Sequence, residues 1–235
     1  MYMKLEICAN SMQSAINAQE AGADRIEFCS ELQVGGVTPS YGLIKEVLAS
    51  VNLPVFILIR PRGGDFVYSD AEFEIMKNDI EMCKKLGCHG IVSGILLSDN
   101  TIDVTRTQEL IELSKPLPFT FHRAFDFVSN PLESLNILIK MGAQRVLTSG
   151  GEANVNQGLS TLKQWRQYAN NKIIVMPGGG VTNLNVELFK DSGFLEIHTS
   201  ASKPMLQNKN LMEGAVQTVS DMKTMQSILK IIRKN

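Results

Sequence analysis

A short pattern that ends in a soft metal ligand occurs three times in this chain. Each copy has an apolar residue, a glutamate, a second apolar residue and then a cysteine or a histidine, as in LEIC, IEFC and LEIH. Thiolates favour Cu(I) and zinc, and imidazole binds either ion, whereas clustered carboxylates act as acids and bases in many active sites. The pattern therefore indicates a metal site at Cys8, Cys29 and His198, or an acid–base site that includes Glu27.

Three further segments, at 59–66, 121–126 and 176–181, are rich in arginine, histidine and glycine. The planar fork of arginine suits carboxylate or phosphate, and the N–H groups of glycine-rich turns can hold an anion. Histidine titrates near neutral pH, so His122 is expected to act as a general acid or base. The candidate catalytic residues are Glu27, Arg60 and His122, and the candidate binding residues are Arg62, Asp65, Arg123, Asp126, Gly179, Gly180 and Ser200.

Short apolar segments alternate with helix-length segments along the whole chain, which is typical of parallel β/α units. Strands are predicted to start near residues 5, 25, 55, 90, 119, 145, 172 and 194. Eight such units that close on themselves form a TIM (β/α)8 barrel, an α/β fold of ~250 residues. An open doubly wound sheet is the alternative, but no Gly-x-Gly-x-x-Gly motif follows the first strand. We therefore predict a single barrel domain over 1–235, with a loop at 202–219 and a last helix at 220–234.

Capping signals mark the starts of several predicted helices. Thr38-Pro39 and Asn130-Pro131 each place a capping side chain before a proline at the first helical position. Ser69 and Glu72 have the spacing of a capping box. These signals support helices that begin near residues 39, 70 and 131.

Side chains alternate between the two faces of a strand, which predicts the residues that point into the barrel. Helices cover the outside, so the apolar residues of the repeated pattern face outward and its polar residues face inward. The last strand of a barrel lies beside the first, which brings the copies together. We therefore expect their glutamates in a lower layer and Cys8, Cys29 and His198 together in an upper layer, near the carboxyl-terminal rim where active sites of this fold lie.

Both groups of residues also have a purely structural interpretation. Glu6, Glu27, Glu196 and Arg60 would form ion pairs inside the barrel, since buried charges must be paired. Buried free cysteines usually serve as small apolar fillers, which would leave the two thiols of the pattern without a function. The sequence leaves these alternatives open.

The composition excludes several classes of function. A formal net charge of −1 provides no footprint for a nucleic acid polymer or an anionic membrane, and no apolar run is long enough to span a bilayer. The first residues lack the basic and long apolar segments of a secretory signal. We therefore expect a cytoplasmic protein whose four cysteines are thiols.

Several motifs resemble those of the CutC family, whose members are known as copper homeostasis proteins. The similar stretches, between residues 4 and 202, are EICANS, GADRIEFCSEL, GGVTPSYGLI, IRPRGGDFVYSD, FHRAFD, RVLTSGG and LEIHTSAS. The resemblance implies a TIM barrel, a cytoplasmic location and a homodimer or homotetramer. It also implies Cu(I) binding at cysteines of the first two strands, which are Cys8 and Cys29 here.

Two functions from different classes follow as hypotheses. The first is a copper homeostasis protein that binds Cu(I) through Cys8 and Cys29, with His198 as a third ligand. The second is a hydrolase or isomerase that acts on a phosphorylated or nucleotide-like small molecule at the carboxyl-terminal rim, because a metal carrier does not need a rim so rich in charged residues. A barrel with an ion-paired interior that acts through a partner surface is a third interpretation.

Overall fold

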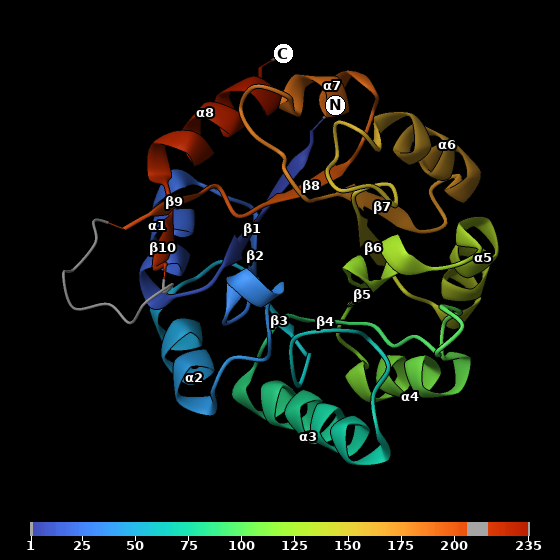
Figure 1. Cartoon of the computed structure of the whole chain (residues 1–235). Coiled ribbons are helices and arrows are strands. Elements are labelled where there is room, and N and C mark those ends of the chain that lie inside the picture. Colours follow the sequence, from blue (N-terminus) through green and yellow to red (C-terminus); the bar gives the residue numbers. More distant parts are fainter. Residues whose placement is uncertain (1, 206–215, 235) are drawn as a thin grey trace.

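The computed structural model describes residues 2–205 and 216–234 of the chain. Within them, eight parallel strands curve into a barrel, which confirms the predicted TIM (β/α)8 fold (Figure 1). The barrel strands are β1 (Lys4–Ala9), β2 (Arg25–Phe28), β3 (Val55–Leu58), β4 (Gly90–Ser93), β5 (Phe119–Phe121), β6 (Arg145–Thr148), β7 (Ile174–Pro177) and β8 (Glu196–Thr199).

The strands follow one another around the barrel, in the order β7-β6-β5-β4-β3-β2-β1-β8. β7 and β8 lie side by side and complete the ring (Figure 1). Because strands in a barrel tilt, neighbouring strands are staggered. Cys8 on β1 is level with Glu27 on β2, and Glu6 on β1 is level with His198 on β8. This stagger decides which side chains meet inside the barrel.

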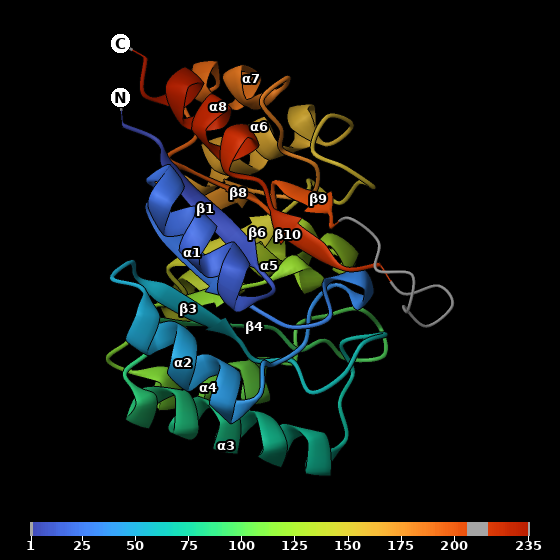
Figure 2. The same ribbon diagram turned by 90° about the vertical axis from the view of Figure 1, so that its left-hand side faces the viewer.

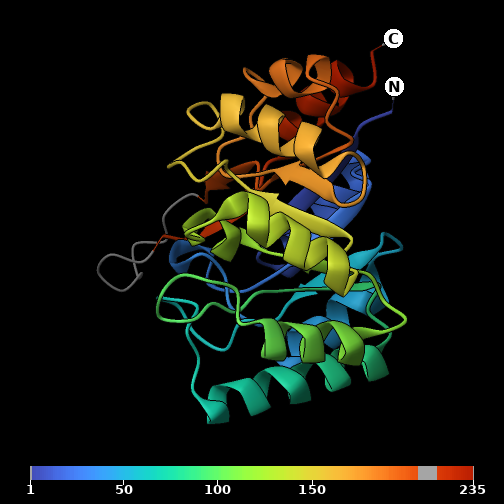
Figure 3. The same ribbon diagram turned by 90° about the vertical axis from the view of Figure 1, so that its right-hand side faces the viewer.

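Helices alternate with the strands and cover the outside of the barrel (Figure 1, Figure 3). They are α1 (Met12–Ala21), α2 (Tyr41–Ser50), α3 (Asp70–Leu86), α4 (Val104–Ser114), α5 (Pro131–Met141), α6 (Leu159–Ala169), α7 (Val186–Asp191) and α8 (Met222–Ile232). Two short 3-10 helices, η1 (Leu32–Val34) and η2 (Arg123–Phe127), lie in loops at the carboxyl-terminal rim. None of the helices in the described part of the chain has the length and apolar character needed to cross a membrane.

Two of the predicted capping arrangements are present. Ser69 and Glu72 form a complete capping box at the start of α3. Asn130 accepts from the third residue of α5, which begins at Pro131. These polar side chains satisfy backbone N–H groups that have no partner within a helix.

The predicted helix start at Thr38-Pro39 is wrong, because α2 begins at Tyr41 and Ser40 provides its cap. The Thr38 hydroxyl accepts from the backbone N–H of Arg60 at 2.9 Å instead. The N–H of Thr38 in turn donates to the carbonyl of Arg60 at 2.9 Å. This segment therefore extends along the end of β3 before the helix starts.

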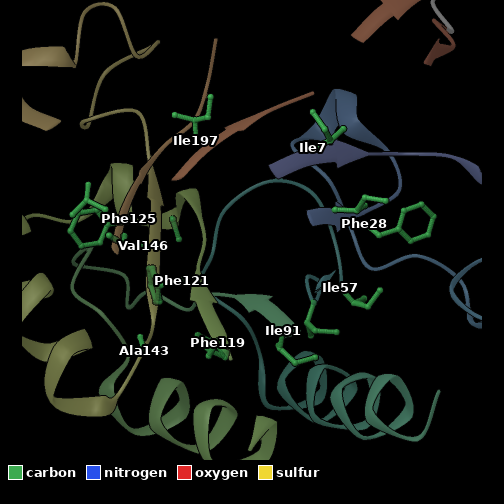
Figure 4. Packing of buried hydrophobic residues seen from close by; sticks show 14 of the residues in the cluster. Ile7, Phe28, Ile57, Ile91, Phe119, Phe121, Phe125, Ala143, Val146 and Ile197 are labelled. Carbon is green, nitrogen blue, oxygen red and sulfur yellow. The ribbon is translucent and has the colours of Figure 1, made fainter. Parts of the chain in front are cut away.

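Apolar side chains fill the space between the strands and the helices (Figure 4). Ile7, Phe28, Ile57 and Ile91 come from four successive strands, lie on the outer side of the sheet and are fully buried. Burial of each such side chain contributes roughly 1.5–3 kcal/mol. The main core therefore lies outside the barrel strands. A smaller apolar cluster of Cys8, Cys29, Phe56, Leu58 and Val92 shares the barrel interior with polar groups.

An antiparallel hairpin, β9 (Ser202–Pro204) and β10 (Thr218–Ser220), follows β8. It lies toward the end of the barrel opposite the two termini (Figure 2). The loop predicted at 202–219 therefore begins and ends in strands. Its residues 206–215 lie outside the described residues. The amide of Asn10 donates to the Thr218 hydroxyl at 3.0 Å, which ties the hairpin to the end of β1.

Candidate functional site

The carboxyl-terminal end of the barrel contains a cavity of about 590 Å³. Small-molecule sites usually have volumes of ~300–1,000 Å³. Its floor is polar, one wall is apolar, and the opposite wall is formed by the turn after β7 and the segment that follows β8. These surfaces are lined by Cys8, Glu27, His122 and His198 (floor), by Leu32, Val34, Leu58, Phe66 and Phe127 (apolar wall), and by Gly179, Gly180, Thr182, Ser200 and Ser202 (opposite wall).

Below the cavity floor, two arginines and two glutamates form a buried ion-pair network. Arg25 donates to Glu6 and, at 2.5 Å, to Glu196. Arg145 donates to Glu196 at 2.7 Å. Both guanidinium groups lie over the ring of Phe56, at 4.7 and 5.3 Å from its centroid. This pairing is what buried charges require, so the ion-pair interpretation holds for these two glutamates.

The stagger of the strands overturns the predicted layers. Sequence alternation alone places Cys8, Cys29 and His198 at one level. In the structure, His198 is level with Glu6, and Cys8 is level with Glu27. Each copy of the repeated pattern is shifted along the barrel relative to the copy on the next strand. A carboxyl group therefore lies beside Cys8 and another beside His198.

His198 is held by Glu6. Its Nδ1 lies 2.7 Å from Oε1 of Glu6. Burial disfavours the Glu6 carboxylate, but Arg25 and His198 outweigh this effect and lower its pKa to about 2. Burial also disfavours the His198 imidazolium, but Glu27 and Glu6 outweigh it and raise the pKa of His198. A carboxylate that binds one ring nitrogen fixes the ring and leaves the other nitrogen for a ligand.

The two thiols of the repeated pattern lie side by side. The Sγ atoms of Cys8 and Cys29 are 3.7 Å apart. Cys8 lines the cavity, whereas Cys29 is fully buried and does not line it. Contact with Cys29 and burial raise the pKa of the Cys8 thiol well above its usual range. The ligand atoms of Cys8, Glu27 and His198 all lie within 4.8 Å of one another.

Glu27 is a buried carboxyl group that has no ion-pair partner within the described part of the chain. Its Oε2 has no hydrogen-bond partner among the described residues, and its Oε1 lies 3.8 Å from Sγ of Cys8. Burial raises the pKa of Glu27 to about 7, and His198 offsets only part of this effect. A carboxyl group that titrates near neutral pH inside a cavity is a candidate acid–base group.

His122 is neutral, which differs from the expectation that it titrates near neutral pH. Its Nδ1 accepts from the backbone N–H of Ala124 at 3.2 Å, which assigns the ring proton to Nε2. Nε2 is buried and has no partner among the described residues. Burial and the charge of Arg60 lower the pKa of His122 to about 3. His122 is therefore suited to donate a hydrogen bond to a ligand rather than to accept a proton.

Arg60 is buried and connects the loops that form the apolar wall. Its Nη1 donates to the carbonyls of Val34 and Gly36 at 2.8 and 2.7 Å, and its Nη2 donates to that of Gly64 at 2.7 Å. The guanidinium lies 4.9 Å from the centroid of the Phe66 ring. Only its Nε lacks a partner among the described residues. Arg60 therefore shapes the cavity as well as lining it.

Arg62 and Asp65, two of the predicted binding residues, do not line the cavity. Arg62 donates to Glu72 at 2.6 Å and to Asp65 at 3.0 Å. The side chains of Arg62 and Asp65 are 37% and 69% exposed. The structure therefore separates this pair from the other candidate residues.

The remaining candidates gather at the wall formed by the β7 turn. Arg123, Gly179, Gly180 and Ser200 line the cavity. Asp126 does not line it, but its buried carboxylate accepts from Nε of Arg123 at 2.8 Å and so orients that side chain. The two glycines have φ angles of +99° and +100°, a conformation that other residues rarely adopt.

Sequence reasoning missed Arg25 and Arg145, the cations of the buried network. Both are the first residues of their strands, where a charged side chain is usually solvated. The available signal was strand periodicity, because Arg25 precedes the inward-facing Glu27 by two positions and Arg145 precedes Leu147 in the same way. The apolar wall was missed because loops supply most of it.

Comparisons with known proteins agree with these features. A sequence model described as "CutC family" matches residues 3–203. The copper homeostasis protein cutC homolog of Homo sapiens is 45% identical over 223 residues, which cover 92% of this chain and 82% of the human protein. A CutC family protein of Proteus mirabilis is 47% identical over 218 residues, which cover 93% of this chain and 87% of that protein.

Solved structures give the same result. A structure described as the copper homeostasis protein CutC of Streptococcus agalactiae superimposes with a TM-score of 0.80 at 36% identity, covering 85% of this chain and 99% of that one. An aldolase, with a TM-score of 0.65 and 14% identity over 85% of this chain and 90% of its own, shares the barrel fold alone. Together with the family match over residues 3–203, these similarities show that this chain belongs to the CutC family of copper homeostasis proteins.

Proposed function

We propose that this protein binds Cu(I) at the cavity floor, with Cys8 and Cys29 as thiolate ligands and His198 as a third ligand. The observation that carries this proposal is the distance of 3.7 Å between the two Sγ atoms, beside a histidine whose Nδ1 is occupied by Glu6. Soft sulfur ligands select Cu(I), and imidazole complements them. The names of the human and bacterial relatives as copper homeostasis proteins support the same ion.

The burial of the thiols affects how such a site would work. The raised pKa of Cys8 means that an incoming ion must displace a proton. The thiolate charge would then be balanced by the metal rather than by a protein cation. Zinc also accepts cysteine, histidine and carboxylate ligands and is therefore the competing ion at this site.

The test is an anaerobic Cu(I) titration against a chromogenic chelator, with zinc titrated in parallel. We expect tight 1:1 binding of Cu(I) by the wild type and a loss of at least ~100-fold in affinity for the Cys8→Ser, Cys29→Ser double variant. Cys83→Ser removes a buried thiol on α3 and serves as the matched control. Equal Cu(I) affinity in the wild type and the double variant would rule out the site.

Relatives and sequence features support two further properties. The resemblance to copper homeostasis proteins supports a cytoplasmic location. The family resemblance also supports a homodimer or homotetramer, which light scattering coupled to size-exclusion chromatography would test.

A second candidate function is suggested by a specific observation. Glu27 Oε2, His122 Nε2 and Arg60 Nε are buried, lack partners among the described residues, and belong to side chains that line one cavity. Buried polar atoms that line a cavity and lack a hydrogen-bond partner are candidates for contact with a ligand. Glu27 can exchange a proton near neutral pH, while a neutral His122 can polarise a carbonyl oxygen. This combination favours an isomerase, with proton transfer next to a carbonyl group, over a hydrolase.

Deuterium exchange tests this activity. A small phosphorylated hydroxyketone such as dihydroxyacetone phosphate, incubated with the protein in D2O, should gain deuterium at the carbon next to its carbonyl group. Glu27→Gln should reduce the rate at least ~100-fold, as expected for loss of a general base. Exchange that persists at the wild-type rate in Glu27→Gln would remove Glu27 from this role.

A further inference from the structure

The wall of the cavity opposite the aromatic rings has the features of an anion site. Arg60 and Arg123 line the cavity, and Glu27 is the only carboxylic residue among the described residues that do so. The cavity as a whole therefore favours an anionic ligand.

The turn after β7 has backbone N–H groups at this wall that lack an acceptor among the described residues. The carbonyl of Gly179 accepts from the N–H of Val155 at 2.9 Å, and the carbonyl of Gly180 accepts from the amide of Asn185 at 2.9 Å. In a trans peptide, the N–H points opposite to the carbonyl, so the N–H groups of Gly180 and Val181 are turned away from these partners. Both residues line the cavity, and neither N–H has an acceptor among the described residues.

Arg123 completes the arrangement. Its Nε donates to Asp126 at 2.8 Å and its Nη2 to the Ser149 hydroxyl at 3.0 Å, which fixes the guanidinium. A Cβ atom added to Gly179 would lie 3.1 Å from Cζ and 3.3 Å from Nη1 of Arg123, so the guanidinium rests against the turn. Nη1 has no acceptor among the described residues. Asp126 reduces the local charge, but it leaves this donor free to contact a ligand.

We infer that the Arg123 guanidinium and the N–H groups of Gly180 and Val181 bind the phosphate of a small phosphate monoester. In this fold, loops after the seventh and eighth strands commonly hold phosphate, and successive N–H groups with an arginine are a strong anion-binding combination. The organic part would extend to the floor, where the unpartnered Glu27 and His122 atoms lie. The choice of an organic ester rests on the second candidate function, whereas the anion site does not.

The structure thereby assigns anion binding to Arg123 and not to Arg62. Both arginines stand at the rim of the barrel and both follow a strand in sequence. Arg62 donates to Glu72 and Asp65 outside the cavity. Arg123 lines the cavity, and its Nη1 has no acceptor in the described part of the chain.

Phosphorus NMR titrations of the full chain with inorganic phosphate and with glycerol 3-phosphate test this inference. Arg123→Gln should weaken binding at least ~10-fold, as expected for loss of a charge-assisted hydrogen bond. Arg123→Lys keeps the charge but loses the planar fork, and it should give an intermediate loss of phosphate affinity. This variant also tests the inference if Arg123→Gln does not fold. Lys203→Gln removes an exposed cation next to Ser202 that pairs with Asp221, and should leave affinity within ~2-fold.

Two outcomes would overturn the phosphate site, and a third would overturn the choice of an organic ester. They are the absence of saturable phosphate binding by the wild type, an equal loss in Lys203→Gln and Arg123→Gln, and equal affinity for phosphate and its glycerol ester. The last of these would remove the organic ester but keep a phosphate site. The phosphate site and the copper site can be tested independently. Arg123→Gln should keep the Cu(I) affinity of the wild type, and the double cysteine variant should keep its phosphate affinity.

Discussion

The guanidinium of Arg25 on β2 reaches across β1 to the carboxylate of Glu196 on β8, at 2.5 Å. The same guanidinium also donates to Glu6 on the strand between them. Three adjacent strands are therefore connected through one buried side chain, at the point where the barrel interior changes from an ion-paired lower half to an open cavity.

Arg25→Met is expected to destabilise the protein by about 3–5 kcal/mol, because it leaves two buried carboxylates short of a partner. Urea unfolding monitored by circular dichroism measures this change. Arg62→Met, at an exposed ion pair, is the control and should cost no more than about 1 kcal/mol. Similar losses in the two variants would mean that the network contributes no more than a surface pair.

Glu27→Met is expected to increase the free energy of unfolding by about 1–3 kcal/mol, because it removes a buried oxygen that has no hydrogen-bond partner in the ranges 2–205 and 216–234. Glu196→Met is the matched control at another buried, inward-facing glutamate. It should have the opposite effect, since Glu196 pairs with Arg25 and Arg145. If both variants are less stable than the wild type, Glu27 stabilises the fold. If Glu27→Met alone is more stable, Glu27 lowers stability and is retained for a functional role.

His122 should make the protein acid-sensitive. Its pKa is about 3 in the folded state against an ordinary value of 6.5, so protonation favours unfolding. The contribution of neutral His122 to the free energy of unfolding is complete above pH 6.5. It falls by about 1.4 kcal/mol per pH unit as the pH drops toward 3. Between pH 7 and pH 4.5, the wild type should lose roughly 2–3 kcal/mol more than His122→Gln.

Chemical unfolding at the two pH values measures this difference. His89→Gln removes an exposed histidine near the start of β4 and should retain the acid sensitivity of the wild type. If His122→Gln has the same pH dependence as the wild type, another group must be responsible.

Gly178→Ala should perturb the site by steric contact, since a Cβ atom there would lie 2.4 Å from Cδ1 of Leu147 and 3.2 Å from Cβ of His198. Overpacking of this kind costs about 1–3 kcal/mol. Leu147→Ala should relieve part of it, so the double variant should be at least ~0.5 kcal/mol more stable than additivity predicts. Strict additivity of the two changes would contradict the contact.

The fold could be predicted because its determinants are local. Strand periodicity, glycine at helix ends and capping residues such as Ser69 each act within a few positions, and each agrees with the barrel. The error at Thr38-Pro39 arose where a tertiary partner, the backbone of Arg60, replaces the expected helix start.

The site was less predictable because its geometry depends on the relation between strands. Alternation correctly turned Cys8 and His198 inward, but the stagger that places Glu6 beside His198 is a property of barrel closure. The neutral state of His122 depends on burial and on Arg60, which is distant in sequence. The same limit applies to Arg123, whose free donor follows from contacts with Asp126 and Ser149.

The position of Cys8 at the cavity surface, with Cys29 behind it, has a kinetic consequence for the proposed copper site. An ion that enters through the cavity meets the sulfur of Cys8 first and that of Cys29 second. In transfer to an acceptor thiol the order would reverse, so that the bond to Cys8 would be exchanged early and the bond to Cys29 would break last. Cys8 would then set the rate of capture, while Cys29 would set the residence time of the ion.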